Sequence, residues 1–407
     1  MNPAGAPPRI HPASEPVTDV SRGPFFLAVL TLTDFRTYAR LKFEAPAGPG
    51  LIVLTGPNGS GKTNLLEAIS FFAPGRGLRA AAVAEPTRWG AAPAAPGSRP
   101  AWAAAARLRG PEGERQIGTG LDPLASAPER RLIHVDGAPA RAQGRLAEAF
   151  AVHWLTPVLE RLFQDGAKAR RKFIDSVAVG LDAAHAERVR SYDQAARERI
   201  RLLTGPPESC DPAWLASLEA GMAETGTALA CARIAAAEKL DAACRAARGP
   251  FPGARVAMAG ALEDWLASGP ALAAEERLAR ALAETRERDR LTATTGAGPQ
   301  RGDMAVAHAL KGLPAAQCST GEQKALLVAL VLGASDLVAA SRGARPVLLL
   351  DEVAAHLDRV RREALFASLL DSGGQVWLAG ADPEPFDWLR GRARFYAARE
   401  GAIEPLR

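Results

Sequence analysis

The segment from Gly56 to Thr63 constrains the fold of this chain more than any other part of the sequence. It reads Gly-Pro-Asn-Gly-Ser-Gly-Lys-Thr and matches the pattern G-x-x-x-x-G-K-[ST]. A short apolar segment, Leu51–Thr55, precedes it, and the residues after it place Leu65, Ile69 and Phe72 on one side of a helix. A strand, a glycine-rich loop and a helix in this order predict the first unit of an α/β fold.

The same loop predicts binding of ATP together with Mg²⁺. Its glycines allow several backbone N–H groups to converge on phosphate oxygens, and the N-terminus of the helix adds a favourable dipole. Lys62 is expected to neutralise the β- and γ-phosphates and so to act in catalysis, and the hydroxyl of Thr63 is expected to ligate the metal. The expected nucleotide-binding residues of the loop are Gly56, Pro57, Asn58, Gly59, Ser60, Gly61, Lys62 and Thr63.

A second motif lies near the other end of the chain. Val347–Leu350 is an apolar strand candidate that ends in Asp351 and Glu352. An apolar run before two acids is common by itself, but its combination with the glycine-rich loop favours a Walker B strand. We expect Asp351 to hold Mg²⁺ through a water molecule and Glu352 to polarise the water that attacks ATP.

A third motif, Ser319–Lys324, reads Ser-Thr-Gly-Glu-Gln-Lys and precedes the Walker B strand. Ser319 followed by Glu322 at the third position is a capping box, which is an ordinary start for a helix. A serine hydroxyl and a glycine at a helix N-terminus also suit a γ-phosphate. The two interpretations are compatible, because a capped helix start can still present its hydroxyl and N–H groups to a phosphate.

The order of these three motifs resembles the ABC ATPase family. In that family the signature segment of one subunit completes the nucleotide site of another, which implies a head-to-tail dimer. Asp358, six residues after Glu352, occupies the position of that family's D-loop aspartate. The resemblance implies further nucleotide-site residues at Ser319, Gly321, Gln323 and Asp358.

Further segments narrow the resemblance to the RecF family of DNA repair proteins, over about residues 26 to 395. Gly298–Asp303 is similar to that family's G-P-H-R-x-D segment, with Gln300 where a histidine is usual. Val158–Glu160 offers no clear Q-loop glutamine, so no ligand is assigned there. The other segments that carry the resemblance are Thr33–Tyr38, Gly75–Arg79, Trp154–Pro157, Lys168–Asp175 and Arg197–Leu203.

The resemblance implies a cytoplasmic, ATP-dependent DNA-binding protein of recombinational repair and replication restart, associated with DNA damage and the SOS response. Such a protein forms a homodimer with ATP and binds DNA at single-strand gaps, mainly through the backbone. It helps to load RecA together with RecO and RecR, and its weak, DNA-stimulated ATPase acts as a switch. Single-stranded, gapped and duplex DNA all remain candidate ligands, and no membrane is implied.

Another ABC-type ATPase subunit, from a transporter or an SMC-like protein, is the alternative function. Transporter subunits usually carry a switch histidine after Walker B, whereas the strand candidate near Gln375–Ala379 leads into Gly-Ala-Asp. SMC-type proteins need coiled-coil arms of hundreds of residues, and the helical segment here covers only residues 185–295. Both features favour the RecF resemblance.

The predicted fold is an α/β, ABC-type P-loop ATPase head that is split by an inserted helical arm, similar to a short coiled coil. We expect a flexible N-terminal extension at residues 1–24, the first part of the head at 25–184, the arm at 185–295 and the second part of the head at 296–407. In the arm, Asp211 and Pro212 predict the start of a helix over 214–245. Further helices are expected over 187–203 and 271–290.

In the first part of the head, the apolar segments 26–32 and 51–55 are expected to be strands, and the Pro/Gly-rich residues 45–50 a hairpin-like connection. The Ala/Pro-rich residues 80–100 are expected to form a surface loop. Segments 103–108, 115–121 and 131–135 are separated by turn residues, which predicts an antiparallel meander.

Composition adds few constraints. The chain has 50 Lys and Arg against 45 Asp and Glu, which permits local basic patches without showing nucleic-acid binding. The run Lys168–Lys172 suits either phosphate contacts or a solvated helix face, and the arginines of Arg188–Arg201 leave the same two alternatives open. The four cysteines form no C-x-x-C pair, and no apolar run reaches the roughly 18 residues of a membrane span. These features are compatible with a reducing cytoplasm.

Overall fold

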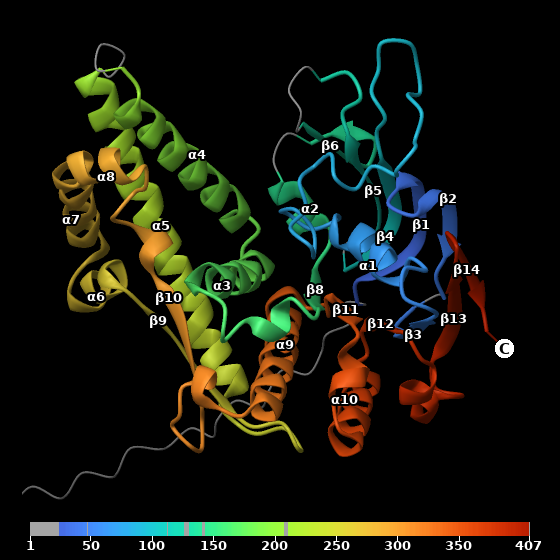
Figure 1. Ribbon diagram of the computed structural model, residues 1–407. Coiled ribbons are helices and arrows are strands. Elements are labelled where there is room, and N and C mark those ends of the chain that lie inside the picture. The colour runs from blue at the N-terminus through green and yellow to red at the C-terminus, as the bar shows by residue number, and fades with distance from the viewer. Residues whose placement is uncertain are drawn as a thin grey trace, which may run out of the picture.

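The computed structural model describes residues 24–46, 48–111, 113–125, 130–140, 143–206 and 211–406. Figure 1 shows two parts side by side, with the two six-stranded sheets and α1 in one part and the helices α4 to α8 with strands β9 and β10 in the other. The predicted N-terminal extension lies outside the described residues except for Pro24, and Cys210 lies outside them as well.

The secondary structure follows the chain in this order. The strands are β1 (Phe26–Phe35), β2 (Tyr38–Glu44), β3 (Gly50–Thr55), β4 (Ala103–Gly110), β5 (Gly113–Leu121), β6 (Arg131–Val135), β7 (Ala138–Pro139), β8 (Val152–Leu155), β9 (Ala254–Ala259), β10 (Asp303–His308), β11 (Val347–Asp351), β12 (Gln375–Gly380), β13 (Arg394–Arg399) and β14 (Ala402–Pro405). The α-helices are α1 (Lys62–Ser70), α2 (Gly144–Ala149), α3 (Ala167–Leu181), α4 (His185–Thr204), α5 (Pro212–Cys244), α6 (Ala261–Ser268), α7 (Ala271–Glu284), α8 (Arg286–Thr292), α9 (Thr320–Arg342) and α10 (Arg359–Asp371). The short 3-10 helices are η1 (Leu159–Arg161), η3 (Pro299–Arg301), η4 (Ala315–Gln317), η5 (Val353–His356) and η6 (Glu384–Leu389).

A six-stranded, mostly parallel sheet in the order β14-β13-β3-β12-β11-β8 carries the nucleotide motifs. β3 pairs in parallel with both β12 and β13, so a strand from the first part of the chain lies between two strands from its end. β11 and β12 are buried along their whole length, as expected for parallel strands that are covered on both faces. Along β3, Leu51 and Val53 pack into one core, and Ile52 and Leu54 pack into the other.

A second, antiparallel sheet has the order β2-β1-β4-β5-β6-β7. Its strands β4, β5 and β6 pair consecutively, which confirms the predicted meander. The expected hairpin-like connection at residues 45–50 is wrong, because β2 intervenes and β3 belongs to the other sheet. β2 was not predicted because only Tyr38 and Phe43 of its seven residues are buried, so its apolar pattern is weak.

One buried side chain joins the two sheets. Gln375 at the start of β12 accepts a hydrogen bond from the backbone N–H of Leu27 at 2.9 Å and donates to the carbonyl of Leu27 at 3.0 Å. Because both halves of the amide are used, this buried polar group is satisfied and costs little desolvation energy.

The helical arm is organised around α5. Asp211 caps this helix by accepting from the N–H of Ala213 at 2.8 Å, with Pro212 in the first turn, so the predicted helix start is confirmed. Met222 and Leu229 pack in the arm core, whereas Leu240 packs in the core that also contains α3 and α9. α5 therefore crosses both regions, and the boundaries proposed at residues 185 and 295 stay a prediction.

The predicted helix over residues 271–290 is two helices. α7 ends at Glu284 and α8 begins at Arg286, with Thr285 between them at φ −91° and ψ 0°. The hydroxyl of Thr285 donates to Asp289 at 2.8 Å, so a local side-chain bond stabilises the new helix start. No proline or glycine marks this break in the sequence, which explains why it was not predicted.

α9 is long and apolar enough, by length and composition alone, to cross a membrane, but 67% of its most apolar window is buried inside the protein. The polar residues Ser335 and Asp336 divide the apolar residues of α9 into two shorter runs, so the helix does not stand out in the sequence as a membrane span. It contacts α3, α5 and β8, as a core helix does, and a buried core helix can be as long and as apolar as a membrane span.

A buried cluster of charged side chains joins the helices of the arm. Arg199 of α4 is fully buried and donates to Glu219 at 2.9 Å, to Asp289 at 2.8 Å and to the carbonyl of Leu282 at 2.7 Å. It thereby joins α4, α5, α7 and α8. A buried charge of this kind is tolerated only while its partners remain in place.

We expect Arg199→Ala to lower the free energy of unfolding by about 3–5 kcal/mol, because Asp289 loses its close cationic partner and Glu219 keeps only Arg286. Denaturant unfolding followed by circular dichroism measures this change. Arg201→Ala is the matched control, since that arginine on the same helix is 75% exposed and pairs only with Glu198. Equal stabilities of the two variants would contradict the assignment.

Candidate nucleotide site

The predicted phosphate-binding loop connects the end of β3 to the start of α1. Gly56, Gly59 and Gly61 adopt φ values of 148°, 83° and 108°, a region that favours glycine. A Cβ atom at Gly61 would lie 2.7 Å from the hydroxyl oxygen of Tyr38, so a side chain is also excluded there by contact. The Tyr38 hydroxyl instead donates to the carbonyl of Gly61 at 3.0 Å and fixes the loop to β2.

Two polar side chains of the loop, those of Ser60 and Lys62, are buried. The Lys62 ammonium donates to the carbonyls of Gly56 at 2.6 Å and Pro57 at 3.0 Å, so it lies over the first turn of the loop. The Ser60 hydroxyl is buried without a hydrogen-bond partner among the described residues. A buried hydroxyl and a buried cation beside a glycine-rich turn fit a phosphate group, which would accept from both.

The loop and the Walker B strand meet directly. The Thr63 hydroxyl donates to Oδ2 of Asp351 at 2.8 Å, and Oδ1 of Asp351 is buried without a partner among the described residues. Burial raises the pKa of Asp351; the Thr63 bond opposes this rise, and the Glu352 carboxylate adds to it. A hydroxyl and an unsatisfied carboxylate oxygen are the hard ligands that Mg²⁺ prefers, so the residues fit the predicted metal.

No self-sufficient metal centre exists in the part of the chain that the structure describes. No group of three or more His, Cys, Asp or Glu residues there could hold a metal ion.

Glu352 has an unusual backbone conformation. Its φ of 57° lies in the left-handed region, which is costly for a residue with a side chain. Its N–H donates to the carbonyl of Ala379 on β12 at 2.9 Å, which holds the turn from β11 into η5. The Glu352 side chain is half-buried. Its position directly after Asp351 is the one at which a base for the attacking water is expected.

Two segments that resemble the RecF family, Thr33–Tyr38 and Gly75–Arg79, stabilise helix α1, which follows the loop. Glu67 of α1 is completely buried and receives Arg36 at 2.8 and 3.0 Å and Arg79 at 2.7 Å. Arg36 comes from the end of β1, and Arg79 comes from the loop after α1. The sequence shows both arginines, but their common partner depends on the fold.

The signature segment forms the start of α9, and the predicted capping box is confirmed. The Ser319 hydroxyl accepts from the N–H of Glu322 at 3.4 Å, and the Glu322 carboxylate accepts from the Ser319 N–H at 3.0 Å. Lys311 forms an ion pair with the same carboxylate and, with the Ser319 bonds, lowers the pKa of Glu322 to about 2. Gly321 is exposed, so its backbone is accessible to a ligand.

Gln323 has internal partners. Its Nε2 donates to the carbonyls of Cys318 at 2.9 Å and Ala316 at 3.2 Å, and its Oε1 accepts from Gln164 at 3.2 Å. The side chain is buried and holds the turn that precedes α9. The nucleotide contact expected for Gln323 therefore stays a prediction, and it would require these bonds to be exchanged.

The predicted site residues form two separate groups. Gly56–Thr63, Asp351 and Glu352 lie at one edge of the parallel sheet, whereas Ser319 and Gly321 lie at the first turn of α9. Figure 1 shows α1 and α9 in different places, and no hydrogen bond or ion pair within the described ranges joins the two groups. Asp358 caps α10 by accepting from the N–H of Arg361 at 2.9 Å and lies with the second group.

Comparisons with known proteins identify the family. A protein of Mesorhizobium japonicum named DNA replication and repair protein RecF is 43% identical over 381 residues, which cover 93% of this chain and 97% of the relative. The protein of that name from Brucella suis is 44% identical over 376 residues, which cover 92% and 94%. The chain belongs to the RecF family.

Structural comparison shows the same fold in a solved protein. A solved structure described as the recombination mediator protein RecF with ATP, in the RecFOR pathway, has a TM-score of 0.78 at 21% identity and covers 95% of this chain and 99% of that chain. Residues 30–79 also match a family model described as an AAA domain. The predicted fold class, a P-loop ATPase head with an inserted helical arm, is confirmed.

The departures from the RecF family pattern have structural explanations. Gln300, where the family usually has histidine, accepts from the Tyr192 hydroxyl at 2.6 Å and donates to the carbonyls of Ala297 at 2.7 Å and Thr295 at 3.1 Å. One acceptor and two donated bonds from a single planar group match an amide side chain. Gln300 therefore fixes the loop between α8 and β10.

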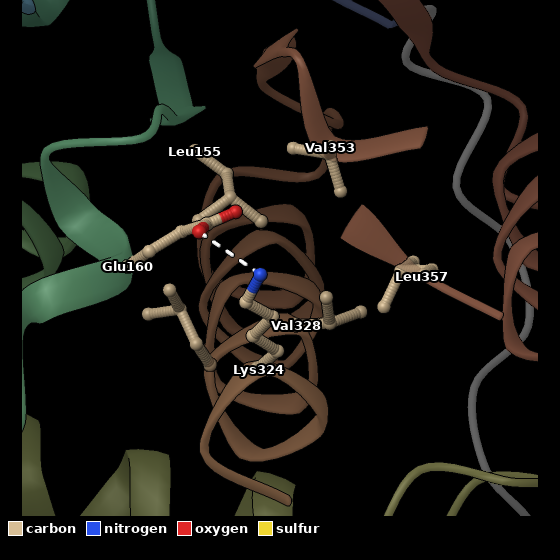
Figure 2. A pocket seen from close by; sticks show the side chains of 7 residues that line it. Leu155, Glu160, Lys324, Val328, Val353 and Leu357 are labelled. Carbon is tan, nitrogen blue, oxygen red and sulfur yellow. Dashed lines mark ion pairs between the residues drawn. The ribbon is translucent and has the colours of Figure 1, made fainter. Parts of the chain in front are cut away.

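The segment after β8, where no Q-loop residue was assigned, contacts the signature helix. Figure 2 shows Glu160 and Lys324 pointing toward each other, and their charged atoms are 3.4 Å apart. The small cavity beside them has a volume of about 10 Å³, and Val328, Val353 and the other apolar residues around it leave room for no more than a water molecule. This contact is therefore a packing junction rather than a ligand site.

The basic run Lys168–Lys172 divides into two kinds of residue. Arg170 forms two hydrogen bonds with Asp303 at 2.7 and 2.8 Å, and Arg171 donates to the carbonyl of Gly302 at 2.6 Å. Lys168 and Lys172 lie one turn apart on the exposed side of α3 and make no ion pair or hydrogen bond among the described residues. Only these two lysines remain available for a phosphate ligand.

The arginines of α4 fit the alternative of a solvated helix face. Arg188 pairs with Asp182 at 2.7 Å, and Arg190 pairs with Glu187 at 3.2 Å. Arg201 pairs with its own helix neighbour, and Arg199 is buried. Most of the positive charge that the sequence shows between Arg188 and Arg201 is therefore compensated within the chain.

We expect Glu352→Gln to bind ATP but to hydrolyse it at a rate that is lower by about 10²-fold or more, because the amide cannot take a proton from the attacking water. The variant should accumulate as an ATP-bound dimer. Phosphate release and sedimentation velocity measure the two effects. Glu384→Gln, which changes an exposed acid of η6, is the control. Unchanged hydrolysis in Glu352→Gln would exclude Glu352 as the base.

Proposed function

We propose that this chain is an ATP-dependent DNA-binding protein of recombinational repair and replication restart. In this proposal ATP and Mg²⁺ close two copies head to tail on DNA near a single-strand gap, and slow hydrolysis opens them. The protein acts in the cytoplasm and helps to load a RecA-type protein together with RecO- and RecR-type partners. The names of its relatives, which describe DNA replication and repair, and its family membership support this function.

The separation of the two groups of site residues carries the proposal. Thr63 and Asp351 are in contact, so one copy can hold ATP and a metal ion. Ser319 and Gly321 are exposed on a different element, and a helix N-terminus of this kind is a good phosphate site that its own nucleotide does not use. A second copy in head-to-tail orientation supplies the missing half of each site.

Exposed apolar side chains around the signature support association with a second copy. These residues are Val158 (67% exposed), Leu310 (90%), Leu313 (43%) and Val360 (68%). The Lys311–Glu322 ion pair holds the segment with Leu310 and Leu313 beside the first turns of α9, and the Glu160–Lys324 ion pair holds the segment with Val158 there. Helix α10, which carries Val360, contacts Gly321. Apolar residues gathered around a polar centre are typical of a surface that another protein covers.

We expect Ser319→Arg to prevent ATP-driven dimerisation, because its side chain would occupy the space that the second copy's γ-phosphate needs. A single chain should still bind ATP, since its own phosphate-binding loop is unchanged. Sedimentation with and without ATP measures dimerisation, and fluorescent-nucleotide titration measures binding. Ser341→Arg, an exposed position at the other end of α9, is the control. Dimerisation of Ser319→Arg at wild-type concentrations would contradict the trans arrangement.

Lys168 and Lys172 are the candidate DNA contacts within the described residues. Lys172 is exposed but partly desolvated by its neighbours, which lowers its pKa, and Lys168 and Arg76 lower it further, so positive groups of α3 and of the loop after α1 lie close enough to repel one another. A phosphate backbone would relieve this repulsion and release counterions on binding. Contacts of this kind do not read base sequence.

We expect the double variant Lys168→Ala and Lys172→Ala to weaken DNA binding and to reduce the slope of log affinity against log salt by about 1.8, or about 0.9 for each lost phosphate contact. The measurement is ATP-dependent binding to gapped, single-stranded and plain duplex DNA over a salt series. Lys42→Ala with Lys239→Ala removes the same charge from other exposed positions as a control. No ATP-dependent binding of any DNA by the wild-type chain would exclude the function.

A further inference from the structure

Arg361 connects the signature turn to the segment after Walker B. It lies in the first turn of α10, and its Nη1 donates to the carbonyl of Gly321 at 3.4 Å. The same nitrogen lies 3.5 Å from Oδ2 of Asp358, whose Oδ1 accepts from the Arg361 backbone N–H at 2.9 Å. No role was assigned to this arginine from the sequence.

The position of Arg361 is determined from several sides. Its side chain is only 29% exposed, and its Nη1 lies 3.5 Å from the position that a Cβ at Gly321 would take. The neighbouring Arg359 is 82% exposed and reaches only Glu363, at 3.8 Å on its own helix. Arg361 therefore faces the signature, and Arg359 does not.

The two segments that Arg361 joins serve different nucleotides under the proposed function. Asp351 and Glu352 act on the ATP of their own chain, and η5 leads from Glu352 to Asp358. Figure 2 shows Val353 and Leu357 near Val328 of α9, so this segment already packs on the signature helix. Arg361 extends that contact to Gly321, which would face the ATP of a second copy.

Charge gives a second reason for an arginine at this position. Two carboxylates, Glu322 and Asp358, lie beside the signature turn and would repel an incoming triphosphate. Lys311 pairs with Glu322, and Arg361 pairs with Asp358. Because a guanidinium stays charged at any physiological pH and has several donors, it can neutralise Asp358 and bind the Gly321 carbonyl at the same time.

We propose that Arg361 is a positioning residue that couples the two ATP sites of the dimer. It holds the signature turn against the segment that follows Walker B, so that closure of one site orders the signature for the other. This inference rests on the proposed ATP-driven dimer and adds to it a residue that acts through Gly321 and Asp358 without touching the nucleotide of its own chain.

The test compares Arg361→Ala, Arg361→Lys and the control Arg359→Ala in the full chain. Nucleotide titration of dilute protein, sedimentation with ATP, and ATPase rate against ATP concentration are measured for each. Arg361→Ala should keep its ATP affinity within about twofold, because the phosphate-binding loop is intact, but should dimerise about tenfold more weakly, as expected for one lost charged hydrogen bond. Its kcat should fall and its Hill coefficient should approach about 1, the value for independent sites.

The remaining outcomes separate the inference from the function on which it rests. Arg361→Lys should recover part of the dimerisation, since an ammonium can still neutralise Asp358, and Arg359→Ala should behave as wild type. Wild-type dimerisation and cooperativity in Arg361→Ala would overturn the inference alone. Loss of ATP affinity in both Arg361 variants would also overturn it, because the residue would then support the fold rather than the coupling. A wild-type chain that does not dimerise with ATP would overturn the proposed function itself.

Discussion

The parallel pairing of β3 with β12 is the interaction on which the nucleotide site depends. It places Leu54 opposite Ala379, and β11 places Asp351 opposite the same residue, so the two motifs reach one edge of the sheet. The Thr63–Asp351 hydrogen bond then joins residues that are 288 positions apart in sequence. Because parallel strands need long connections, this arrangement also leaves room for the entire helical arm between the motifs.

The signature depends on a different set of contacts. α9 is buried between α5, α3 and β8, and this burial gives its first turn a rigid support. Around that turn, each acidic side chain has a basic partner from another segment, Lys311 for Glu322 and Arg361 for Asp358. The exposed backbone at Gly321 therefore faces outward from a neutralised surface, which suits the approach of a phosphate from a second chain.

The sequence predicted well the features that depend on neighbouring residues. The phosphate-binding loop, the Ser319 capping box and the Asp211 cap all form as expected, because their bonds lie within a few residues. It predicted poorly the features that depend on distant partners. The strand β2 has few buried residues, and the inward turn of Arg170 and Arg171 needs a loop more than 130 positions away.

By itself, the sequence determined the types and order of the motifs, and through them the family, the fold class and the residues suited to phosphate and metal. Only the tertiary structure decided which of these residues meet. Thr63 meets Asp351, Arg36 and Arg79 share Glu67, and Arg361 reaches Gly321. The physical reason is that local backbone and capping preferences are encoded in short segments, whereas ion pairs between segments depend on sheet register and helix packing across the whole chain.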